Sequence, residues 1–176
     1  GIIAERSPGS TLKPALYAIG YERGFLTPGT KLLDVPIEIG GYEPENFTQR
    51  FYGLVSSEQA LVNSLNIPAV DLLNKIGVND FTEFMESAGF KKISRNKDKL
   101  GLSMILGGCG VTLEELTTFY STFANDGKLK FPKYLKDDND LEEKRIISKE
   151  TSYIIAEILS GKQRNDMLVD YDYSKL

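Results

Sequence analysis

Ser10 and Lys13 are the residues of this sequence whose types and spacing best fit covalent chemistry. They stand three positions apart where a helix is predicted to begin, and positions i and i+3 share one helix face. A serine hydroxyl is a weak nucleophile, but a neighbouring lysine amine can take its proton once burial or positive neighbours lower the lysine pKa. The free N–H groups at a helix N-terminus also suit a developing oxyanion. The pair therefore predicts a serine nucleophile with a lysine base.

The composition excludes the histidine-dependent mechanisms that would compete with a lysine base. The chain contains no histidine, so a Ser-His-Asp or Cys-His mechanism is impossible within it. Zinc sites that use histidine are excluded as well, and the single cysteine, Cys109, cannot form a thiolate cluster. The net charge of −4 argues against nucleic acid as a partner, because phosphate binding needs clustered lysine and arginine. Any base must therefore be Lys, Asp, Glu or Tyr.

The Ser-x-x-Lys spacing is weak evidence by itself, and the sequence holds a second copy at Ser94 and Lys97. That copy lies in residues 91–99, a charged stretch without apolar periodicity, which predicts a solvated loop. We therefore expect Ser94 and Lys97 to be exposed and far from Ser10. For Ser10 and Lys13, the alternative without chemistry is a helix N-cap followed by a surface lysine.

The elements that must position these residues are mainly helices. Apolar periodicity predicts helices over residues 12–22, 56–64, 69–76, 81–88 and 150–159, another after residue 112, and one short strand within 31–39. Ser56 and Thr112 open two of these helices as capping boxes, while Asp80 and Ser148 are predicted caps of two others. Residues 40–53, 132–144 and 162–176 are predicted to be loops. No apolar run reaches the roughly eighteen residues of a membrane span, and residues 1–5 do not resemble a signal peptide.

The sequence around this pair, and a second motif further along the chain, resemble those of a known family. The segment RSPGSTLKP at residues 6–14 closely resembles the nucleophile segment of penicillin-binding proteins, a family marked by Ser-x-x-Lys, Ser-x-Asn and Lys-Thr-Gly motifs. Ser64 and Asn66 fit the second motif, in a turn between two predicted helices and with family-like flanks at 56–61 and 67–70. The alternative interpretation of both residues is helix termination, which Ser and Asn favour.

The resemblance extends over most of residues 6–160. Segments 41–47 (GYEPENF) and 100–108 (LGLSMILGG) are similar to the bifunctional class A proteins of the 1C type, although the glycines could serve backbone conformation alone. Neither Lys-Thr-Gly nor Lys-Ser-Gly occurs in the chain. In the family that motif follows the region matched here, so we expect the chain to end before it.

The resemblance implies a fold class and a domain. We expect a mainly α chain, the helical part of the α/β serine β-lactamase/transpeptidase-like fold, with most sheet strands outside it. Residues 1–176 would be a partial transpeptidase domain, without the glycosyltransferase domain, the membrane anchor and the C-terminal strands of the parent protein. That parent would be anchored in the cytoplasmic membrane and act on its periplasmic face.

The resemblance also implies a reaction, peptidoglycan D,D-transpeptidation. Ser10 would attack the penultimate D-Ala carbonyl of a stem peptide, and β-lactams would acylate the same hydroxyl. Lys13 would be the base, Ser64 a proton relay, and Asn66 a clamp on Lys13 or on the substrate amide. No metal or organic cofactor is implied. Two alternatives stay open: a β-lactamase-like hydrolase, and a helical fragment that is not catalytic by itself.

Overall fold

The computed structural model describes residues 4–134 and 143–161, which are mainly helical. The α-helices are α1 (Lys13–Glu22), α2 (Ser57–Val62), α3 (Asn66–Ile76), α4 (Val78–Ser87), α5 (Lys91–Asn96), α6 (Leu113–Ala124) and α7 (Lys149–Ser160). The 3-10 helices are η1 (Gly9–Leu12), η2 (Lys97–Lys99) and η3 (Leu102–Leu106), and the strands are β1 (Lys31–Asp34), β2 (Gly53–Ser56), β3 (Lys128–Leu129) and β4 (Lys144–Arg145).

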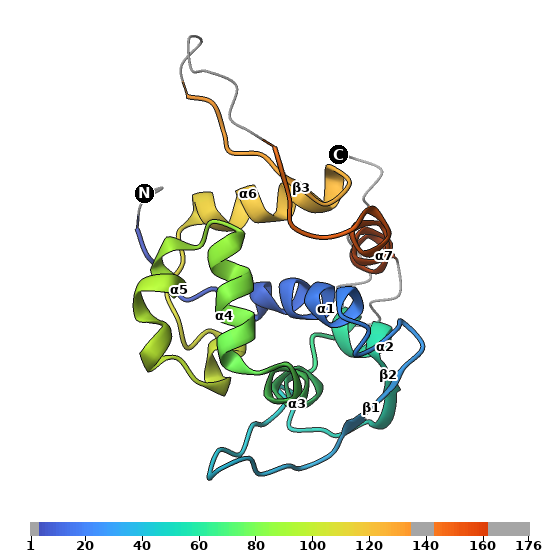
Figure 1. Cartoon of the computed structure of the whole chain (residues 1–176). Coiled ribbons are helices and arrows are strands. Elements are labelled where there is room, and N and C mark those ends of the chain that lie inside the picture. The colour runs from blue at the N-terminus through green and yellow to red at the C-terminus, as the bar shows by residue number, and fades with distance from the viewer. Residues whose placement is uncertain (1–3, 135–142, 162–176) are drawn as a thin grey trace, which may run out of the picture.

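Helix α1 is the centre of the fold. It runs through the middle of the molecule in Figure 1, and helices α2, α3, α4 and α7 contact it. Residues 13–20 are all buried, because neighbours cover every side of the helix rather than one apolar stripe. Lys13 lies at the start of this buried stretch, so its amine is enclosed by the core and not by solvent.

Strands β1 and β2 form an antiparallel ribbon at the edge of the helical body. Leu32 pairs with Val55 and both are buried, whereas Leu33 and Leu54 pair with their side chains exposed. The alternation is that of a ribbon with one face on the core. Asp34 ends β1 and is fully buried, although it is an acidic residue.

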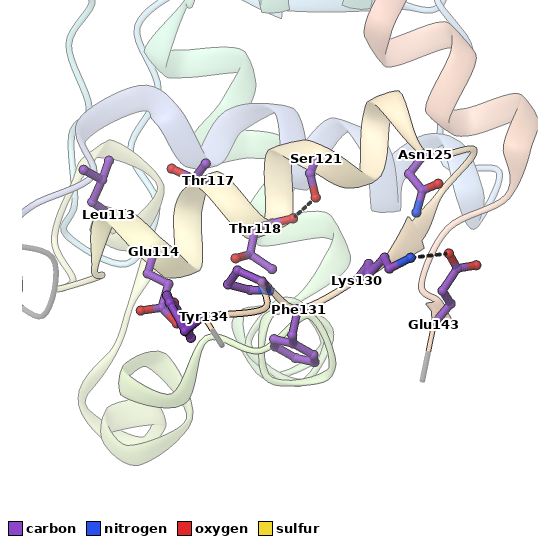
Figure 2. Close-up of a pocket in the computed structure, with 11 residues that line it drawn as sticks. Leu113, Glu114, Thr117, Thr118, Ser121, Asn125, Lys130, Phe131, Tyr134 and Glu143 are labelled. Carbon is purple, nitrogen blue, oxygen red and sulfur yellow. Dashed lines mark hydrogen bonds and ion pairs between the residues drawn. The ribbon is translucent and has the colours of Figure 1, made fainter. Parts of the chain in front are cut away.

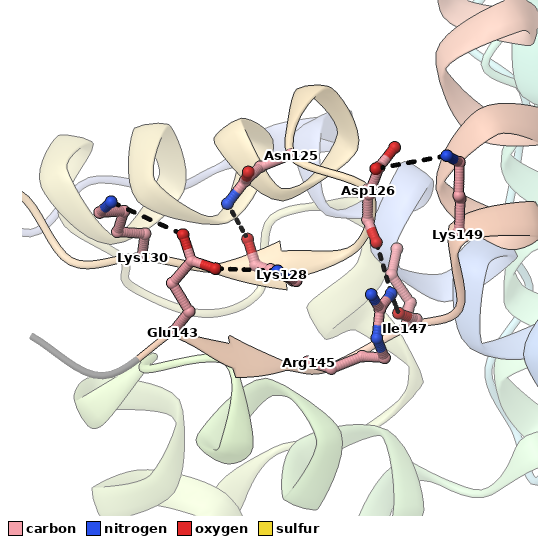
Figure 3. Close-up of polar contacts among 8 residues, drawn as sticks. All are labelled: Asn125, Asp126, Lys128, Lys130, Glu143, Arg145, Ile147 and Lys149. Carbon is pink, nitrogen blue, oxygen red and sulfur yellow. Dashed lines mark hydrogen bonds and ion pairs between the residues drawn. The ribbon is translucent and has the colours of Figure 1, made fainter.

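Strands β3 and β4 form a second small ribbon beyond α6, fixed by polar contacts (Figure 3). Glu143 accepts from Lys128 at 3.0 Å and lies 3.6 Å from Lys130. Arg145 donates to the carbonyl of Asp126 in the turn between α6 and β3. These contacts are exposed, so each contributes little to stability.

The predicted capping residues are mostly confirmed. Ser56 and Thr112 accept from the backbone N–H of Gln59 and Glu115, whose side chains accept in return, and Ser148 caps α7. Asp80 is a correction, because α4 begins at Val78 after Gly77 and the Asp80 side chain instead pairs with Arg23.

The interpretation of residues 91–99 as a solvated loop is wrong. They form α5 and η2, with Ile93 buried beneath exposed charged side chains. Ser94 is partly buried rather than exposed and donates to Glu86 at 2.7 Å, while Lys97 is exposed as predicted. One apolar anchor holds a helix of this length, which is too short to show periodicity in sequence.

Helix boundaries and loops differ in smaller ways. Helix α3 begins at Asn66, three residues before the predicted start, and β2 begins at Gly53, inside the predicted loop 40–53. The predicted tail 162–176 lies outside the described residues, as do residues 135–142 of the loop 132–144. In the part of the chain that is described, no helix could cross a membrane and no acidic, cysteine or histidine cluster could hold a metal ion.

Candidate active site

The Lys13 amine is held by the turn that connects α2 to α3. Its Nζ donates to the carbonyl oxygen of Ser64 at 2.6 Å and to Asn66 Oδ1 at 2.7 Å, and lies 3.2 Å from Ser64 Oγ. The side chain is 1% exposed. Three of the four predicted site residues therefore meet around one nitrogen, and the surface-lysine alternative is wrong.

Burial changes the acid–base behaviour of this amine. Desolvation disfavours the ammonium form and lowers the pKa of Lys13 from 10.5 to about 7. A solvated lysine is almost fully protonated at neutral pH, whereas Lys13 is close to half neutral there. Lys13 can therefore accept a proton under physiological conditions, which a general base requires.

Ser64 reaches Lys13 because its backbone is in the left-handed region. Its φ is +53°, unusual for a residue with a Cβ, and it follows the last turn of α2, where its N–H donates to Leu61. Ser64 therefore also helps to end helix α2, as the helix-termination alternative predicted. The same conformation aims both its carbonyl and its hydroxyl at the amine.

Asn66 is the first residue of α3, and its amide orientation follows from its partners. Nδ2 donates to the carbonyl of Glu45 at 2.7 Å, so Oδ1 is the atom left to face Lys13. A carbonyl oxygen cannot donate, which excludes the flipped amide. Both polar ends of Asn66 are thus occupied within the protein, and of its two predicted roles the geometry matches the clamp on Lys13.

Ser10 lies at the mouth of the site. It is exposed, in η1, and lines a cavity of about 310 Å³ together with Lys13, Ser64 and Tyr120. Although positions 10 and 13 were expected to share a helix face, no hydrogen bond joins Ser10 Oγ to Lys13 Nζ among the described contacts, and the amine donates to Ser64 and Asn66 instead. Both residues therefore line one cavity without a hydrogen bond between their side chains.

Two contacts that sequence reasoning missed support the turn that carries Ser10. Ser7 Oγ donates to the carbonyl of Gly107 at 2.8 Å, and the Tyr120 hydroxyl donates to the carbonyl of Thr11 at 2.9 Å. A Cβ on Gly107 would lie 3.0 Å from the Cα of Gly9, so only glycine fits under this turn. In the sequence, Tyr120 lies in the helix predicted after residue 112, and Gly107 lies in the family-like segment 100–108.

A second cavity lies apart from these residues. Figure 2 shows it on the face of α6, lined by Thr117, Ser121, Phe131 and their neighbours, with a volume of about 640 Å³. It is larger than the Ser10 cavity, and none of the four predicted site residues lines it.

Comparison with known proteins agrees with this geometry. The family model for the penicillin binding protein transpeptidase domain matches residues 2–169. Penicillin-binding protein 1C of Escherichia coli is 38% identical over 157 residues, covering 89% of this chain and 20% of that protein. Penicillin-binding protein 1F of Bacillus subtilis is 32% identical over 171 residues, covering 90% and 23%.

A solved structure shares the fold. Penicillin-binding protein 3 of Mycobacterium tuberculosis, crystallised with ampicillin, superposes with a TM-score of 0.78 at 19% identity, over 90% of this chain and 41% of that one. The helical body around α1 is thus part of an α/β fold. The chain spans about a fifth of the length of the two curated relatives.

Proposed function

This chain belongs to the penicillin-binding protein transpeptidase family, and on that premise we propose that it carries the nucleophile and base of a peptidoglycan D,D-transpeptidase. The observation that carries the proposal is the buried Lys13 amine, whose pKa of about 7 lets it serve as a base beside the cavity that Ser10 lines. A surface helix cap would need neither feature.

The proposed reaction begins with Ser10. As its Oγ attacks the penultimate D-Ala carbonyl, the hydroxyl proton passes to neutral Lys13 and an oxyanion forms. The C–N bond to the terminal D-Ala then breaks, and the leaving amine takes a proton, which Ser64 Oγ relays from Lys13 Nζ over 3.2 Å. The amine of a second stem peptide then attacks the ester and restores the Ser10 hydroxyl. A β-lactam would acylate Ser10 by opening of its C–N bond.

The contacts of Lys13 suit the first step. A neutral amine has two N–H groups and one lone pair. Ser64 O and Asn66 Oδ1 are fixed acceptors for both N–H groups, which leaves the lone pair for a third direction. Since Ser10 lines the same cavity, its hydroxyl can donate to that lone pair after rotation about its own Cα–Cβ bond.

The rest of a complete site is proposed to come from residues outside this sequence. The Ser10 backbone N–H can supply one oxyanion donor, but a second donor and a cation for the substrate carboxylate belong in the family to the Lys-Thr-Gly strand, which these residues lack. We propose accordingly that residues 1–176 are a partial domain of a membrane-anchored protein that works on the periplasmic side, with stem peptides and β-lactams as its partners.

A labelling experiment tests the proposal. Full-length protein is treated with fluorescent penicillin, and the modified residue is identified by mass spectrometry. We expect acylation of Ser10, its loss in Ser10→Ala, and normal labelling in Ser94→Ala, the matched change in the second Ser-x-x-Lys copy. Labelling that survives Ser10→Ala would contradict the proposal. Rapid hydrolysis of the acyl-enzyme would favour the β-lactamase-like alternative. Labelling of the full-length protein but not of folded residues 1–176 would favour a fragment that is not catalytic by itself.

A further inference from the structure

A chain of buried and partly buried hydrogen bonds leads from Lys13 to an acidic residue on β1. Lys13 donates to Asn66, and the backbone N–H of Asn66 donates to Asn46 Oδ1 at 2.8 Å. Asn46 Nδ2 donates in turn to Asp34 Oδ1 at 2.7 Å. Asn46 is 4% exposed and Asp34 is fully buried, so the polar atoms of both side chains depend on hydrogen bonds within the protein.

The direction of this chain is fixed at its far end. Both oxygens of Asp34 act as acceptors, Oδ1 for Asn46 Nδ2 and Oδ2 for the Tyr52 N–H at 2.8 Å. Asn46 must therefore turn its amide nitrogen toward Asp34, where the same nitrogen also reaches the carbonyl of Arg50 at 2.9 Å. Its carbonyl oxygen is left to face the N–H of Asn66. Asp34 and the Arg50 carbonyl thus fix together which end of the Asn46 amide faces Asn66.

Residues 45 and 46 hold Asn66 through two hydrogen bonds. Glu45 accepts from its side-chain amide and Asn46 accepts from its backbone N–H, one of the unpaired donors at the start of α3. Figure 1 shows the loop between β1 and β2 passing beside α3, so these two hydrogen bonds join the helix to a distant part of the sequence. Because Asp34 holds Asn46, it also holds the loop that carries Glu45.

We propose that Asn46 and Asp34 are positioning residues, which hold Asn66 so that its carbonyl oxygen faces the Lys13 amine. The proposal rests on the function inferred above for Ser10 and Lys13. Neither residue touches the cavity that Ser10 lines, so both act through Asn66. Without them Lys13 loses a fixed acceptor, and its lone pair is no longer aimed at the nucleophile.

The loss of that acceptor changes a measurable property of Lys13. A protonated amine gains more from an acceptor than a neutral one does, so removal of the acceptor favours the neutral form and lowers the pKa of the base. In the same cavity, α2 and α7 contribute the aliphatic residues Leu61, Val62, Ile158 and Leu159. Tyr120 also faces it, but burial raises the pKa of Tyr120 to about 12. Among the described residues that line the cavity, Lys13 is therefore the group that titrates between about pH 5 and 9.

The test compares acylation of Ser10 by penicillin, as a function of pH, in full-length wild type and three variants. Asp34→Asn changes one atom of the carboxyl group and leaves a single acceptor oxygen for two donors, Asn46 Nδ2 and the Tyr52 N–H. Asn46→Ala removes the link itself and serves if the first variant does not fold. Asp71→Asn is the matched control, since Asp71 is a partly exposed residue of α3 that pairs with Lys75 and is not among the residues that line the Ser10 cavity.

We expect Asp34→Asn and Asn46→Ala to acylate about 10- to 100-fold more slowly at their optimum pH, the scale of a small misplacement of a catalytic group. The midpoint of their pH–rate profiles should lie about half to one pH unit lower than in wild type. Asp71→Asn should match wild type in both. A purely structural role would lower the melting temperature but leave the midpoint of the folded protein in place, and that result would overturn the inference. Wild type that is not acylated at Ser10 would instead refute the proposed function.

Discussion

The pH dependence of acylation is the sharpest consequence of the Lys13 environment. Desolvation lowers the pKa of its amine from 10.5 to about 7, a difference that corresponds to roughly 5 kcal/mol between the two protonation states. At pH 7 about half of the amine is neutral, against roughly one part in three thousand for a solvated lysine. Burial therefore supplies on the order of a thousandfold more base at that pH.

The direction of the effect follows from the role of the base. Only neutral Lys13 accepts the Ser10 proton, so the acylation rate should be constant above pH 8 and fall about tenfold per unit below pH 7. At pH 5 it should be about a hundredfold below the plateau. Lys13→Met keeps an unbranched side chain, one atom shorter, but removes the base, and should lower the plateau by about 10² to 10⁴-fold.

The assay is stopped-flow or gel-based measurement of penicillin acylation between pH 5 and 9, on folded full-length protein. The Lys13→Met profile should be flat over the same range, because no group that titrates there remains among the described residues of the cavity. A wild-type midpoint near 10, typical of a solvated lysine, would refute the argument from burial. A Lys13→Met profile that keeps the wild-type midpoint would show that another group is the base.

Three further predictions concern the support of the site. Gly107→Ala places a Cβ near Gly9 at a φ of +106°, so it should cost about 1–3 kcal/mol of stability in thermal unfolding, whereas Gly29→Ala, in open space, should cost much less; equal melting temperatures would contradict the close packing. Tyr120→Phe removes the hydrogen bond to Thr11 and should slow acylation a few-fold, and an unchanged rate would show that this bond does not hold the nucleophile turn. The pKa of Lys13 is lower in the folded state than in the unfolded state, so between about pH 7 and 10.5 the unfolded state binds one more proton. The free energy of unfolding of wild type, relative to that of Lys13→Met, should therefore rise by about 2 kcal/mol from pH 7 to 9. A difference that stays constant with pH in urea unfolding would contradict this prediction.

Sequence predicted what depends on near neighbours. The capping boxes that open α2 and α6 involve residues three positions apart, so their side chains meet once the helix forms. The Ser-x-x-Lys and Ser-x-Asn residues came from spacing and resemblance. The meeting of Lys13 with Ser64 was an inference from the two motifs together, and the contact itself is present.

The sequence did not predict the contacts and helices that depend on residues far apart in the chain. Asn46 lay in a predicted loop, and nothing local shows that its amide would pair with Asn66 twenty residues later and with Asp34 twelve residues earlier. Helix α5 was missed for a related reason. Its stability comes from Ile93 in the core and from the bond between the Lys91 N–H and Glu115, a residue of another helix. Tertiary contacts of this kind override local charge patterns.

The separation of Ser10 from Lys13 fits the division of work in the proposed site. The Lys13 amine is buried, so it needs hydrogen-bond partners that keep a fixed position. The carbonyl of Ser64 and the side chain of Asn66 are these partners. Ser10 must reach an incoming carbonyl, and an exposed hydroxyl can rotate between amine and substrate in picoseconds to nanoseconds. A bond from Ser10 to Lys13 before substrate binds is therefore not required. What the proposed chemistry requires is a free lone pair on Lys13, and two fixed acceptors for its N–H groups leave one.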